Sequence, residues 1–146
     1  MLFLLLNCEL PITRIQTLLG RLFAIDAGKV MDVLSVSSTE LYYDLHLLAQ
    51  SKTPRSAALA SSFFVELGVY PHGQLEAIYD SQEAFARAFS RESQLPVLVS
   101  GDNMPDPYTW LLFEAELVYE VKEWPEDEET QAITVFPANK KLLPPG

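Results

Sequence analysis

The densest group of potentially reactive side chains is a run of carboxylates near the end of the chain. Between positions 114 and 129 there is one base, Lys122, and eight acids: Glu114, Glu116, Glu120, Glu123, Glu126, Asp127, Glu128 and Glu129. Carboxylates can ligate a metal, act as general acid and base, or attract a positively charged partner. An acid–base pair needs two carboxylates at a defined separation, which a sequence does not specify.

A second group of oxygen ligands lies in the segment 101–107. Asp102, Asn103 and Asp106 are of the type that calcium prefers, but the segment lacks the alternating acids and the closing glutamate of a calcium loop. Asp, Asn, Gly and Pro are also the usual residues of turns. We therefore expect a plain loop, with no metal and no cofactor.

The two histidines do not belong to a catalytic motif. His46 falls on the outward side of a predicted strand, and His72 precedes Gly73 in a predicted turn. The sequence names no orienting partner for either, and it contains no nucleophile signature or glycine-rich phosphate loop. We expect a protein that is not an enzyme. A small carboxylate-dependent hydrolase, which would need a cleft with two facing carboxylates, and a scaffold or adaptor subunit with a flat apolar patch are the alternatives.

The net charge of −10 lies entirely after position 55, since residues 1–55 carry five bases and five acids and the remainder carries five bases and fifteen acids. Such a charge repels nucleic acid and attracts basic protein surfaces. Glu116 and Glu120 should share the outward face of a strand at 117–122, close to three aromatic residues. The predicted partner-binding residues are Asp102, Asp106, Tyr108, Trp110, Glu116, Glu120, Glu123, Trp124, Glu126, Asp127, Glu128 and Glu129.

The elements that must position these residues belong to one domain, because 146 residues with 49% apolar side chains suffice for one core. Apolar periodicity predicts helices at 11–25, ended by Gly28, and at 81–92, capped by Asp80. The remaining apolar segments predict strands, including a hairpin of 30–36 with 41–49 around a turn at 37–39 and a hairpin of 63–70 with 75–79 around a turn at 71–73. The expected fold is α+β, a largely antiparallel sheet with two helices on one face, and residues 137–146 form an extended tail.

The apolar start of the chain predicts a buried strand at 2–10. It lacks a basic leader, and Asn7 and Glu9 interrupt it too early for a signal peptide or a membrane span. Cys8 is the only cysteine, which excludes an internal disulfide and is typical of a reducing compartment. We expect a cytoplasmic protein that does not bind a membrane.

Residues 80–113, DSQEAFARAFSRESQLPVLVSGDNMPDPYTWLLF, resemble a pattern in small bacterial immunity proteins of polymorphic-toxin and contact-dependent growth inhibition systems. The resemblance rests on the helix with Phe85 and Phe89, the strand at 96–100 and the segment from Asp106 to Trp110. It covers about a quarter of the chain. It implies an acidic inhibitor that binds a cognate toxin domain, in many systems a nuclease, and blocks its basic active site.

Overall fold

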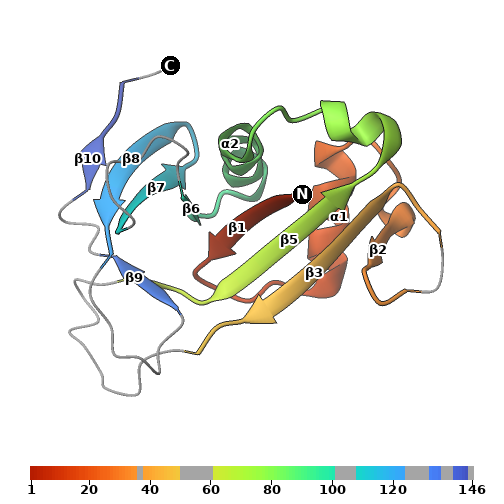
Figure 1. Ribbon diagram of the computed structural model, residues 1–146, viewed down its shortest axis with the longest axis horizontal. Coiled ribbons are helices and arrows are strands. Elements are labelled where there is room, and N and C mark those ends of the chain that lie inside the picture. Colours follow the sequence, from red (N-terminus) through yellow and green to blue (C-terminus); the bar gives the residue numbers. More distant parts are fainter. Residues whose placement is uncertain (36–37, 50–60, 101–107, 124–131, 136–139, 145–146) are drawn as a thin grey trace.

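The fold is α+β, as expected, and its framework is a sheet of eight strands in the order β10-β8-β7-β6-β1-β5-β3-β2 (Figure 1). The computed structural model describes residues 1–35, 38–49, 61–100, 108–123, 132–135 and 140–144. All neighbouring strands of this sheet are antiparallel except β2 and β3. The first strand of the chain, β1, is therefore central, with β5 on one side and β6 on the other.

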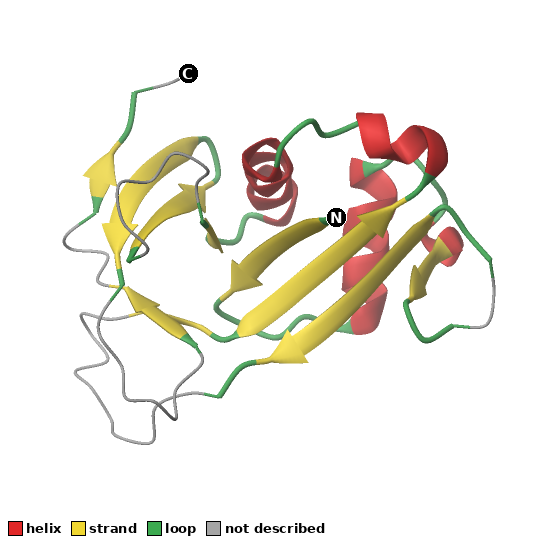
Figure 2. Ribbon diagram, in the orientation of Figure 1, coloured by secondary structure: helices red, strands yellow, loops and turns green. Residues whose placement is uncertain are grey.

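The elements follow the chain in this order: β1 (Leu2–Leu6), α1 (Ile12–Leu22), the 3-10 helix η1 (Ala27–Lys29), β2 (Val30–Asp32), β3 (Leu41–Leu47), β4 (Ser61–Phe63), β5 (Val65–Pro71), the 3-10 helix η2 (Gly73–Ala77), α2 (Gln82–Ser93), β6 (Val97–Val99), β7 (Thr109–Glu114), β8 (Leu117–Lys122), β9 (Ile133–Val135) and β10 (Lys141–Leu142). Figure 2 shows them by type.

Both helices cover the same face of the sheet, as the apolar periodicity predicts. Ile15 and Leu19 of α1 and Phe85 and Phe89 of α2 are fully buried in one core cluster. The strands contribute alternate residues to it, for example Leu4 of β1, because successive strand side chains point to opposite faces. In the view of Figure 1, α1 lies behind β5 and β3, so the reader looks onto the face without helices.

The helix ends differ from the prediction. Helix α1 stops at Leu22, and Ala24 rather than Gly28 adopts the left-handed conformation, with φ 56°. The tight turn lets the amide of Ile25 donate to the carbonyl of Gly20 at 2.9 Å. Helix α2 is capped by Ser81, not Asp80, since the Ser81 hydroxyl accepts from the amide of Ala84 at 3.0 Å.

Both predicted hairpins are wrong. Strands β2 and β3 pair in parallel, so the segment between them returns the chain to its starting side and is not a tight turn. After β5 the chain forms η2 where a strand at 75–79 was expected, because Leu75 packs into the core from a helical turn. Strand β1 also ends at Leu6, four residues before the predicted end.

A second, two-stranded sheet made of β4 and β9 packs on part of the face without helices. Phe63 of β4 and Val135 of β9 join Leu5, Leu98 and Leu112 in a second core cluster. The expected tail is partly sheet: β10 pairs with β8, and Leu143 packs against the main core. The small sheet covers the β6–β7–β8 side of this face.

Candidate functional site

The face of β1, β5 and β3 that points away from the helices carries a group of polar and aromatic side chains, which we call the open face. Strand register places its members on one side of the sheet, since Phe3 opposes Gly68, Gly68 opposes Asp44, and Glu66 opposes His46. The open face consists of Phe3, Tyr42, Asp44, His46, Glu66, Gly68 and Tyr70. No lysine or arginine occurs in these three strands.

The centre of the open face is the carboxylate of Asp44. Its Oδ2 accepts from the hydroxyl of Tyr70 at 3.2 Å and lies 3.3 Å from Nε2 of His46. Its Oδ1 is buried and has no hydrogen-bond partner among the described residues. Buried polar atoms are nearly always paired. The described residues therefore leave one buried acceptor of Asp44 unsatisfied.

Gly68 makes room for this carboxylate. A Cβ atom at position 68 would lie 3.0 Å from both the ring of Phe3 and the hydroxyl of Tyr70, and it would clash with Oδ1 of Asp44. Asp44 can fold down over the neighbouring strand only because that strand has no side chain there. An alanine at position 68 would therefore require the carboxylate of Asp44 to move.

The surroundings of Tyr70 hold its phenol in the neutral form. Burial raises the pKa of Tyr70, and the nearby charge of Asp44, the hydrogen bond to Asp44 and the charge of Glu66 raise it further. Two carboxylates thus act on one hydroxyl. The open face is a negatively charged surface with aromatic side chains between its acids.

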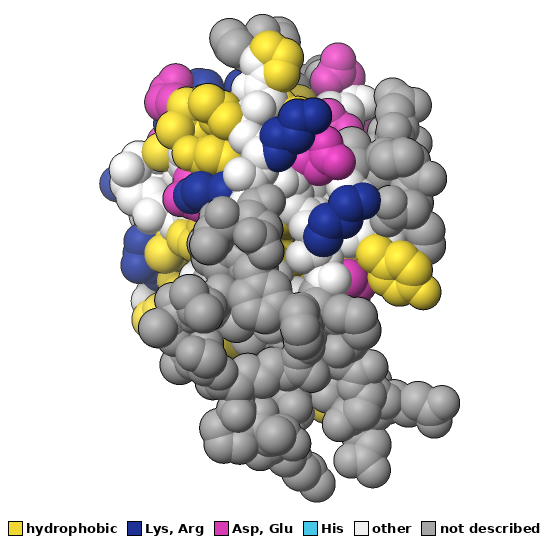
Figure 3. Space-filling model, turned by 90° about the vertical axis from the view of Figure 1, so that its left-hand side faces the viewer, with side chains coloured by type: hydrophobic (Ala, Val, Ile, Leu, Met, Phe, Trp, Pro, Cys, Tyr) yellow, Lys and Arg dark blue, Asp and Glu magenta, His cyan; other side chains and the backbone are white. Residues whose placement is uncertain are grey.

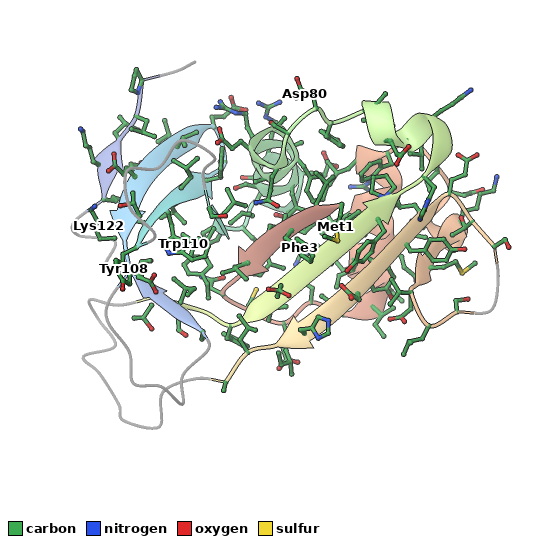
Figure 4. All side chains as sticks on the ribbon, viewed as in Figure 1. Met1, Phe3, Asp80, Tyr108, Trp110 and Lys122 are labelled. Carbon is green, nitrogen blue, oxygen red and sulfur yellow. The ribbon has the colours of Figure 1, made fainter. Side chains whose placement is uncertain are left out.

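A cavity of about 350 Å³ adjoins the open face. Phe3 and Glu66 belong to both, and the remaining wall is mostly apolar, with Leu5, Leu98 and the indole of Trp110. Trp110 and Phe3 come from β7 and β1, which flank β6 (Figure 4). Pockets of this kind, apolar with few polar groups, are where proteins bind small ligands or single side chains.

Gln82, the first residue of α2, closes the cavity on the helix side. Strand β6 pairs with β1 only at Leu5 and Leu6, so the edge of β1 is unpaired at Phe3. The side-chain carbonyl of Gln82 accepts from the amide of Phe3 at 3.0 Å in place of a strand. Gln82 also lines a second hollow, of about 410 Å³, together with Met1 and Asp80. One residue thus contributes to the walls of two hollows.

Most residues of the predicted interface lie outside the described residues: Asp102, Asp106, Trp124, Glu126, Asp127, Glu128 and Glu129. Of the five that are described, three come together. Trp110 is half-buried in the cavity wall, and its indole Nε1 donates to the carboxylate of Glu123 at 3.4 Å. The amide of Glu123 donates to the carbonyl of Tyr108 at 2.9 Å, and the side chain of Tyr108 is 62% exposed.

Glu116 and Glu120 do not lie with Trp110, which corrects the expectation of one shared surface. Trp110 opposes Val121 in the β7–β8 register, whereas Glu120 opposes Leu111, which faces the helices. Glu116 forms an ion pair with Arg91 of α2 at 3.1 Å. The outer surface of β8 and β10 shows basic and acidic side chains side by side (Figure 3). We call this end of the main sheet, made of β8, β10 and the β7–β8 turn with Glu114, Glu116 and Lys140, the strand edge.

Sequence reasoning missed the open face. The alternation of Asp44 with His46, and of Glu66 with Gly68 and Tyr70, was a readable signal. It did not reveal that the two strands pair in the register that brings Asp44 beside Tyr70. Among the described residues, no group of three or more His, Cys, Asp or Glu side chains is arranged to hold a metal ion. In the same part of the chain, no helix is long and apolar enough to cross a membrane.

Comparison with known proteins gives no significant match: no family model fits the chain, and neither a curated protein nor a solved structure resembles it. The functional proposal therefore rests on the chemistry of the open face and its adjoining cavity.

Proposed function

We propose that this chain is a non-catalytic inhibitor that binds a basic bacterial toxin domain, and that the open face with its adjoining cavity is the binding surface. The observation that carries the proposal is the composition of that face: Asp44 and Glu66 lie among Phe3, Tyr42 and Tyr70, on strands without a lysine or arginine. Interfaces combine aromatic anchors with charges that complement the partner.

The strand edge fits this role less well. There, Glu114 is paired with Lys140 at 3.1 Å and Glu116 with Arg91 at 3.1 Å. Carboxylates that are already neutralised by a neighbour contribute less to the attraction of a basic partner. The open face has only His46 as a possible internal cation, at 3.3 Å from Asp44.

A carboxylate-dependent hydrolase would require two facing carboxylates in a cleft. The cavity of the described part of the chain is lined by one, Glu66. Asp44 lies outside the cavity wall and is engaged by Tyr70 and His46. This geometry supports binding of a cation better than paired acid–base chemistry.

The test is to co-express this chain with candidate basic toxin domains that stop bacterial growth, and to measure growth and the affinity of the complex. The wild-type chain should restore growth. Glu66→Lys should lower the affinity at least about 30-fold, because it places a like charge in the centre of the interface. Glu76→Lys, with the same charge change on the exposed turn η2, is the matched control and should retain full protection.

Two outcomes would contradict the proposal. Protection by Glu66→Lys at the wild-type level would exclude the open face. If simultaneous reversal of Glu126, Asp127, Glu128 and Glu129 to lysine abolished binding while Glu66→Lys preserved it, the interface would lie on the acidic loop.

A further inference from the structure

The cavity between Phe3, Glu66 and Trp110 combines features that suit one chemical group. The described part of its wall contains two aromatic rings and four leucines, together with one carboxylate, one amide and one hydroxyl, from Glu66, Gln82 and Ser100. Among these described wall residues, Glu66 has the only ionisable side chain. An isolated carboxylate beside aromatic rings attracts cations through both its charge and the ring quadrupoles.

The amide of Gln82 adds an acceptor of fixed orientation. Its carbonyl oxygen is held at 3.0 Å from the amide of Phe3, and a carbonyl oxygen has a second lone pair. The indole of Trp110 is held in turn by Glu123 at the other side of the wall. Gln82 and Trp110 are therefore held in place before a ligand enters, which lowers the entropy cost of binding.

We propose that this cavity binds a guanidinium group. A guanidinium is planar, stacks on aromatic rings and is more weakly hydrated than an ammonium, so it enters an apolar cavity at a smaller desolvation penalty. A cavity of about 350 Å³ is near the lower end of the size range of ligand sites, which suits a single side chain or a small organic cation. The assignment of an arginine of the protein partner as the source rests on the proposed function; the preference of the cavity for a guanidinium does not.

The experiment uses the full chain and three small probes: n-butylguanidinium, n-butylamine and the uncharged n-butylurea. Binding is followed by NMR at the indole N–H of Trp110 and the side-chain amide of Gln82. Butylguanidinium should shift both signals and bind at least about tenfold more tightly than butylurea. Butylamine should bind more weakly than butylguanidinium. Equal binding of butylguanidinium and butylurea, or no shift with any probe, would overturn the proposal without the need for a variant.

Glu66→Gln tests the assigned carboxylate. It should remove the preference for the cation over butylurea, while Glu76→Gln should leave that preference unchanged. Retention of the full preference in a folded Glu66→Gln chain would overturn the assignment of Glu66.

The source of the guanidinium is tested by competition. Butylguanidinium at a concentration that fills the cavity should weaken the complex with the toxin domain several-fold, whereas butylurea should not. If the probe binds but does not compete, the partner's arginine is excluded and a free organic cation is the ligand. If the toxin domain does not bind at all, the proposed function fails while the probe titration still decides the chemistry of the cavity.

Discussion

The open face and the strand edge both carry carboxylates, yet they present different surfaces to a partner. On the open face, Asp44 and Glu66 have no lysine or arginine on their own strands. On the strand edge, Glu114 and Glu116 each lie 3.1 Å from a basic side chain. The number of carboxylates along the sequence therefore does not by itself tell which described surface would attract a basic partner. The electrostatic potential at each surface depends on whether its carboxylates have basic side chains beside them.

The largest effect should come from filling the space under Asp44. Gly68→Ala should lower the free energy of unfolding by about 2–3 kcal/mol, because its Cβ would displace the carboxylate of Asp44 from its hydrogen bond to Tyr70 and crowd Phe3. Urea unfolding measures this. Gly28→Ala is the matched control, since nothing lies within 4 Å of its Cβ, and it should change stability by no more than about 0.5 kcal/mol. Equal free energies of unfolding for the two variants would mean that the position of the Asp44 carboxylate does not depend on the absence of a side chain at position 68.

The strand edge should depend on a buried hydroxyl. The Oγ of Ser90 lies 2.6 Å from the carbonyl of Leu95 and 3.0 Å from that of Phe113, and it accepts from the amide of Ala115 at 3.0 Å. Ser90→Ala should cost about 2 kcal/mol, because buried backbone groups lose their partner. Thermal unfolding measures the loss. Thr17→Ala, which removes an exposed hydroxyl, should have an effect below about 0.5 kcal/mol; a similar loss in both variants would refute the role of Ser90.

The charge of Asp44 on the open face should also affect the titration of Tyr70. The pKa of Tyr70 lies above its ordinary value through burial and the charge of Asp44, so Asp44→Asn should lower it. Because the pKa of Tyr70 is higher in the folded state than in the unfolded state, its neutral phenol contributes to the stability of the fold. This contribution is complete below the ordinary tyrosine pKa of about 10 and is lost as the pH rises through the folded-state pKa of Tyr70. Ultraviolet titration of tyrosinate, with Tyr70→Phe to assign the transition, measures both. An unchanged titration in Asp44→Asn would exclude coupling between the two side chains.

The smallest effect is expected for the ion pair of the strand edge. The side chains of Arg91 and Glu116 are 55% and 73% exposed, so solvent screens their attraction. Arg91→Ala and Glu116→Ala should each change the free energy of unfolding by less than about 0.5 kcal/mol. A double-mutant cycle in urea measures the coupling energy of the two side chains. A coupling energy above about 1 kcal/mol would show that the ion pair is held more rigidly than the exposure of its side chains implies.

The sequence predicted the periodic elements well because their apolar spacing is local information. Helix α2 (Gln82–Ser93) and strand β8 (Leu117–Lys122) lie where the pattern placed them, and the α+β class followed from them. The parallel pairing of β2 with β3 was not predictable from the segment between them, since turn residues also occur in longer connections. The direction in which β2 and β3 pair depends on contacts with the rest of the sheet, which the local sequence does not contain.

The candidate site was predicted only in fragments. Trp110 and Glu123 were singled out for their types, and they do meet at the cavity. Asp44 and Tyr70 are 26 residues apart, and only the register of β3 against β5 brings their side chains together. A one-residue shift in that register would turn all alternate side chains to the helix side, which is why the site could not be derived without the pairing.

The central position of β1 also sets the order in which the chain can fold. Leu2–Leu6 pairs with Val65–Val69 and with Val97–Leu98, so neither edge of the strand has its partner nearby in sequence. Chains that depend on such distant contacts fold slowly, because loop closure opposes the pairing before any burial compensates for it. During synthesis, β1 waits for about 60 residues before β5 follows it and about 90 before β6 does, and in that period its unpaired edges are open to aggregation or to a chaperone.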